Sequence, residues 1–142
     1  MNRIAITLFS ALLIAPVNAF AESMMSDAPA NAEVYFVQPS DGATVEGTFK
    51  VVFGLRNMGV APAGVDKAGI GHHHLLIDTG VPSDLSKSLP ANDQIKHFGG
   101  GQTETEITLQ PGEHTLRLLM GNYAHVPHSP PVVSEQITIT VE

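Results

Sequence analysis

The sequence predicts an all-β fold, an antiparallel β-sandwich of about seven strands. In several segments apolar residues recur at every second position, which is the period of a strand with one buried face. Short runs rich in Gly, Pro, Asp and Ser separate these segments. No segment after residue 32 shows the helical period of about 3.6 residues. The 142 residues suit one domain.

The N-terminal 21 residues have the pattern of a secretory signal peptide, residues 1–21. Arg3 supplies a positive charge, an apolar run follows from Ile4 to Val17, and Ala19–Ala21 offers a small-residue cleavage site. The apolar run is shorter than the about 20 residues of a membrane-spanning helix, so no membrane span is expected after signal removal. We therefore expect a periplasmic or secreted protein.

Residues 22–32 are small and polar and are expected to form a flexible leader. A single β-sandwich domain is expected over 33–142, with strands at 34–37, 45, 48–55, 72–78, 95–98, 102–109, 114–120 and 132–141. The segment 48–55 shows the cleanest alternation, and most of the core is expected from Phe36, Phe49, Val51, Phe53, Leu75, Ile77, Ile107, Leu109, Leu116, Leu118, Ile137 and Ile139.

The last two strands resemble the closing strands of immunoglobulin-like domains. A tight turn at 110–113 precedes an apolar strand, and a loop then leads to a final Thr/Val strand. The expected fold is therefore immunoglobulin-like, although the chain has neither the Cys nor the Trp of antibody domains.

The composition excludes several function classes. The formal charge of -7 argues against a nucleic-acid partner, because phosphate binding requires a basic surface. Without Cys the chain has no disulfide and no thiol nucleophile. Ser129, His128 and Asp78 form a triad on paper, but no nucleophile-elbow motif surrounds the serine. The sequence does not favour an enzyme.

Seven histidines are the main chemical feature. On the expected strand at 72–78, His72 and His74 share one face and His73 lies on the other. Two such histidines on one face can chelate an ion, and neutral imidazole suits copper and zinc. His97 ends a strand before three glycines, and a loop containing three prolines carries His125 and His128.

The candidate metal ligands are His72, His73, His74, His97, His125 and His128. We expect at least two imidazoles among His73, His74, His97 and His125 to lie close together, because strand ends and loops meet at one pole of a sandwich. A hydrolase or metal-assisted enzyme is a third and less favoured hypothesis beside two main ones. One is a periplasmic protein that binds copper or zinc for sequestration or delivery. The other is a metal-free immunoglobulin-like module that contacts another envelope protein and whose histidines are structural.

Three stretches of the chain resemble domain-of-unknown-function family 4399, a group of small exported bacterial proteins. They are GHHHLLID, IKHFGGGQTETEITLQPGEHTLRL and HVPHSPPVVSEQITITV, and the resemblance runs from Tyr35 to Val141. It implies no activity. Members often carry a further histidine at the position of Ile95, so the resemblance also implies an altered site in this chain.

Overall fold

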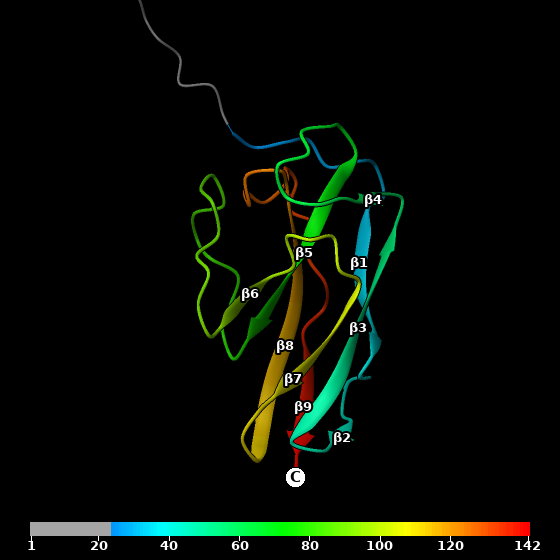
Figure 1. The fold of residues 1–142 in the computed structure, drawn as a ribbon, viewed down its shortest axis with the longest axis vertical. Helices are drawn as coiled ribbons and strands as arrows, with labels where there is room; N and C mark the ends of the chain where they lie inside the picture. Colours follow the sequence, from blue (N-terminus) through cyan, green and yellow to red (C-terminus); the bar gives the residue numbers. More distant parts are fainter. Residues whose placement is uncertain (1–23) are drawn as a thin grey trace, which may run out of the picture.

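The computed structural model describes residues 24–142 and is an all-β, immunoglobulin-like sandwich (Figure 1). The expected signal peptide, residues 1–21, lies outside the described residues. Strands account for all of the regular secondary structure in 24–142, as the sequence predicts. This part of the chain contains no helix long and apolar enough to cross a membrane.

One sheet has three strands in the order β1-β3-β7. They are β1 (Glu33–Gln38), β3 (Thr48–Arg56) and β7 (Glu104–Thr108), and both pairings are antiparallel. The alternation predicted for β3 is observed, because Phe49, Val51 and Phe53 are buried on one face.

The second sheet has the order β2-β9-β8-β5-β4, and β6 also pairs with β5. Its central strands β5 (Ile70–Ile77) and β8 (Gly112–Gly121) are antiparallel, and β9 (Ile137–Val141) runs antiparallel to β8. The short strand β6 (Ile95–His97) is antiparallel to β5, whereas the two-residue strands β2 (Thr44–Val45) and β4 (Gly59–Val60) make parallel pairs.

Seven of the nine strands found in residues 24–142 have three or more residues, in line with the predicted number. Most strand boundaries differ from the predicted ones by one or two residues, and two differences are larger. The strand β4 lies in an expected loop, and β9 begins at Ile137 rather than at Val132. The later start has a local cause, because the Ser134 hydroxyl accepts the Leu118 N–H and interrupts the backbone ladder.

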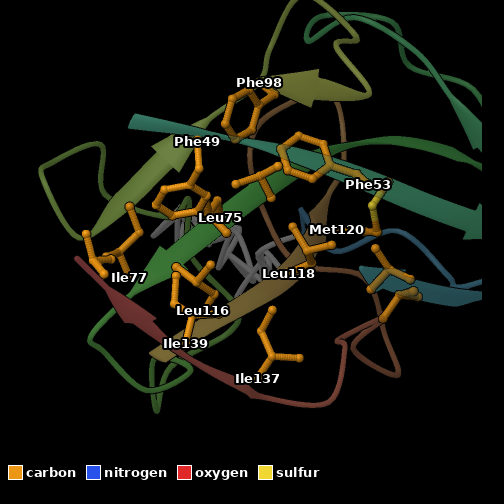
Figure 2. Close-up of a cluster of buried hydrophobic side chains, with 14 residues drawn as sticks. Phe49, Phe53, Leu75, Ile77, Phe98, Leu116, Leu118, Met120, Ile137 and Ile139 are labelled. Atoms are coloured by element: carbon orange, nitrogen blue, oxygen red, sulfur yellow. The ribbon is translucent and has the colours of Figure 1, made fainter. Parts of the chain in front are cut away.

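The main core lies between the two sheets (Figure 2). It contains all twelve residues predicted for it, nine of them buried and Phe36, Ile107 and Leu109 partly buried. The prediction missed further buried members of the cluster, which are Val34, Phe98, Met120, Val132 and Val141.

A second apolar cluster covers the outer face of the larger sheet. Leu76 and Leu119 project from β5 and β8, and Leu89 and Ile95 come from the segment that leads into β6 and from β6 itself. The chain between β5 and β6 therefore shields a sheet face that would otherwise meet solvent. As a result, every residue from Gly71 to Ile77 is buried.

The described part of the expected leader, residues 24–32, lies along the domain. The amide of Ala28 donates to the carbonyl of Ser129, the amide of Ser129 donates to the carbonyl of Ser26, and Ala28 and Ala32 pack against the main core.

A Phe53→Ala substitution should lower the free energy of unfolding by about 3–5 kcal/mol, because it empties a packed ring site. Phe53 is 4% exposed, and its ring centroid lies 4.8 Å from that of Phe98 and 5.0 Å from that of His73. Urea denaturation measures the change. The control Val65→Ala removes a side chain that is 44% exposed and should change stability by less than about 0.5 kcal/mol. Equal stability of both variants would contradict the packing described.

Candidate metal centre

The histidines of β5 lie on opposite faces of the strand, as the sequence predicts. His73 points into the main core, where it stacks on Phe53. His72 and His74 lie on the outer face, with ring centroids 4.6 Å apart. All three side chains are fully buried.

The neighbouring strands complete the outer surface around His74. On one side the register places His97 of β6 directly beside His74, and their ring centroids are 4.4 Å apart. On the other side Gly121 of β8 leaves room for the imidazole, since a Cβ at Gly121 would overlap the His74 ring. The loop after β8 then brings His125 over this row.

Three ring nitrogens converge at this place. The His125 Nδ1 atom lies 2.9 Å from His72 Nε2 and 3.3 Å from His74 Nε2. One ligand atom from each of the three residues lies within 4.8 Å of the other two. Nitrogens bound tetrahedrally to zinc at about 2.0–2.1 Å lie about 3.3 Å apart, so the group has the spacing of a metal site. We call His72, His74 and His125 the histidine triad, and it could hold a metal ion.

His97 lies at the edge of the triad. Its ring stacks on that of His125 with centroids 4.5 Å apart. His97 donates its Nε2–H to the carbonyl of Pro90, at 3.0 Å. A neutral imidazole carries one N–H, so His97 Nδ1 keeps a free lone pair and can act as a ligand atom.

The expectation that at least two of His73, His74, His97 and His125 meet is confirmed, because His74, His97 and His125 do so. His73 faces the opposite side of β5 and does not belong to the triad. His128 is also outside it and donates Nε2–H to the carbonyl of Ile70, at 3.2 Å.

His114 was not a predicted ligand, and its contacts agree with that. Its Nδ1 lies 2.7 Å from a carboxylate oxygen of Asp78, and its Nε2 lies 2.8 Å from the carbonyl of Gln110. Both ring nitrogens therefore face acceptors, and the hydrogen bond to Asp78 raises the pKa of His114.

The loop that carries His125 depends on a residue that sequence reasoning missed. Asn122 is 1% exposed, and its Oδ1 accepts the backbone N–H groups of Ala124 and Val126. His125 itself has a φ of 62°, a left-handed conformation that is uncommon outside glycine. The turn around Asn122 holds His125 in this conformation. A polar residue directly after an apolar strand was the available sequence signal.

Burial keeps the triad uncharged. Desolvation, with a smaller contribution from neighbouring histidines, lowers the pKa of His72 to about 4 and that of His74 to about 2. Desolvation also lowers the pKa of His125. Neutral imidazole is the form that binds metal. The triad is therefore ready to ligate at neutral pH without losing a bound proton.

The metal-free protein should lose stability as pH falls below about 6.5, the ordinary histidine pKa. The unfolded chain takes up protons near that pH, whereas burial lowers the folded-state pKa of His72 and His73 to about 4. Each such group removes up to about 1.4 kcal/mol per pH unit between the two pKa values. His114 has a raised pKa, and the stability that it contributes is fully present below about pH 6.5, so it does not oppose the loss there. Urea denaturation at pH 7.5, 6 and 5 measures the slope.

The variant His73→Leu tests the assignment, because neither ring nitrogen of His73 has a hydrogen-bond partner among the described residues. This variant should reduce the dependence of the free energy of unfolding on pH by the contribution of one proton, and it should leave the fold intact. A stability that is constant from pH 7.5 to 5 in the parent protein would refute the buried neutral state of these imidazoles.

The comparisons with known proteins identify the family but no activity. No curated protein and no solved structure gives a match to the chain. A family model described as "Domain of unknown function (DUF4399)" matches residues 51–142, which include β5, β6 and the loop after β8. All four clustered histidines fall within the matched segment. The chain belongs to the DUF4399 family.

Proposed function

We propose that this protein binds a copper or zinc ion through the histidine triad, with His97 as an additional ligand, and serves in sequestration or delivery of the metal. The signal-peptide features of residues 1–21 support a site of action in the periplasm or outside the cell. The metal ion is the partner that the proposal requires.

The convergence of the three nitrogens of the triad carries the proposal. His72 and His74 come from β5 and His125 comes from a loop about 50 residues later, so local sequence does not bring them together. All the donors are neutral imidazoles, and copper and zinc suit this donor type better than magnesium or calcium, which prefer oxygen.

The partial exposure of the site fits a binding and release role. His72 and His74 are fully buried, whereas His97 and His125 are partly exposed. An ion can therefore reach the triad from the side of His97 and His125 and leave by the same side. No Asp or Glu belongs to the group, so all of its donor atoms are imidazole nitrogens.

The metal-free alternative has one observation in its favour. The hydrogen bond of 2.9 Å between His72 and His125 ties the loop after β8 to β5 without any ion. In that case the protein is an envelope module that contacts another protein. Metal content and its dependence on single histidines separate the two functions.

Isothermal titration of the protein at pH 7.5 with zinc or copper should show one saturable equivalent. Loss of an outer-shell partner weakens metal binding by about 10–100-fold. A His74→Ala substitution should weaken binding by more than that, because it removes a ligand. The matched control His73→Leu changes the adjacent residue on the opposite face of β5 and should leave the affinity unchanged. Identical affinities of both variants would exclude a site at the triad.

The variants His74→Ala and His97→Ala and their combination test whether the two residues share one site. Residues that hold the same ion give non-additive losses, because the first substitution already damages the site. We expect the double variant to lose measurably less binding free energy than the sum of the two single losses. Additive losses of stability with unchanged metal content would instead favour the metal-free module.

A further inference from the structure

The N-terminal segment reaches the metal-binding loop through one buried side chain. The Asn122 side-chain amide donates one N–H to the carbonyl of Met24, at 2.7 Å, and the other to the Ser26 hydroxyl, at 2.9 Å. Its oxygen accepts the backbone N–H groups of Ala124 and Val126. All four hydrogen-bonding positions of this amide are used, two toward the N-terminal segment and two toward the turn that carries His125.

Backbone contacts hold the same segment against the far end of the loop. Ala28 donates to Ser129, and Ser129 donates to Ser26, both at 2.9 Å. Residues 24–28, which we call the strap, thus contact the loop at Asn122 on one side of His125 and at Ser129 on the other. Figure 1 shows this blue segment at the same end of the molecule as the orange loop after β8.

The loop needs such a clamp because His125 is held in a left-handed conformation. A non-glycine residue in that region is strained and persists only where its surroundings fix it. The turn itself contributes two backbone hydrogen bonds, from the amide of His125 to the carbonyl of Asn122 and from the amide of Asn122 to the carbonyl of Val126, both at 2.9 Å. Fixing the orientation of the Asn122 amide fixes both N–H groups that define the turn.

We propose that the strap is a positioning element of the metal site, acting through Asn122 on His125. This inference rests on the proposed function and deepens it, because it assigns a role to a segment outside the ligand set. It also makes the strap a reporter of metal occupancy. If docking of the strap favours metal binding, metal binding favours docking of the strap by the same factor.

Two substitutions weaken the strap without touching the loop. Ser26→Ala removes the hydroxyl that accepts from Asn122, and Ala28→Pro removes the amide that donates to Ser129. Each has a matched control. Ser26→Thr keeps the hydroxyl. Ala30→Pro places proline at an exposed position inside the turn closed by the Ala32 amide and the Pro29 carbonyl, where proline fits.

The first measurement is zinc affinity by isothermal titration of the full mature chain. Ser26→Ala and Ala28→Pro should each weaken zinc binding by about 10-fold, as loss of an outer-shell partner does, with unchanged stoichiometry. Both controls should match the parent protein. Unchanged zinc affinity in both strap variants would overturn the proposal while leaving the proposed function in place.

The second measurement is amide hydrogen exchange. In the metal-free protein, Ser26→Ala should speed exchange at Ala124 and Val126, the two amides bonded to Asn122, and leave the core strands unchanged. In the parent protein, zinc should slow exchange at Ala28 and Ser129. A uniform increase over the whole domain would show that the strap merely stabilises the fold, and would overturn the positioning role.

The two measurements separate the two proposals. If the parent protein takes up neither zinc nor copper, the proposed function fails. Exchange at Ala124 and Val126 then still decides whether the strap positions the loop, since that effect does not require metal. If metal binds and the exchange pattern does not respond to Ser26→Ala, only the strap proposal fails.

Discussion

Burial of both faces of β5 is the constraint on which the rest of the site depends. One face packs in the main core and carries His73. The other is covered at Leu76 by Leu89 and Ile95, and at His72 and His74 by His97 and by the loop that carries His125. Without that cover, alternation would leave the outer imidazoles in water, each free to rotate and to take up a proton. The cover fixes their rotamers and removes the solvent that would stabilise their charged forms.

Because the outer face is buried, polar groups there lower the stability of the fold unless they contact one another. Among the described residues, His72 and His74 satisfy their Nε2 atoms through His125 alone, which lies on a separate loop. The chain between β5 and β6 fastens that loop, because Leu89 donates to the carbonyl of His125 and Ser88 donates to that of Ala124. Two segments that follow β5 thus cooperate to hold one imidazole over two others. The cluster is a tertiary feature rather than a property of any one motif.

Local periodicity predicted the parts of the structure that depend on one strand at a time. The alternation around Phe53 and the split of His73 from its neighbours both follow from side chains that point to opposite faces. Pairing between distant strands has no comparable local signal. The register that sets His97 beside His74 and the exclusion of His128 were therefore beyond sequence reasoning, and the one signal for Asn122 was its place directly after an apolar strand. At the position of Ile95, where the family resemblance implies a further histidine, the structure has a buried apolar contact instead.

The proposed binding of an ion would change the placement of protons in the triad. Without metal, His125 Nδ1 can accept N–H groups from both His72 and His74, so one lone pair satisfies two donors. If the triad bound an ion, the ring protons of His72 and His74 would move to the other nitrogen of each ring, whereas His125 already presents the lone pair of Nδ1. Such binding would release no proton, unlike binding at a thiolate site. The positive charge of the ion would then stay in the protein, with no carboxylate in the group to balance it. Partial exposure of His97 and His125 would let water screen that charge.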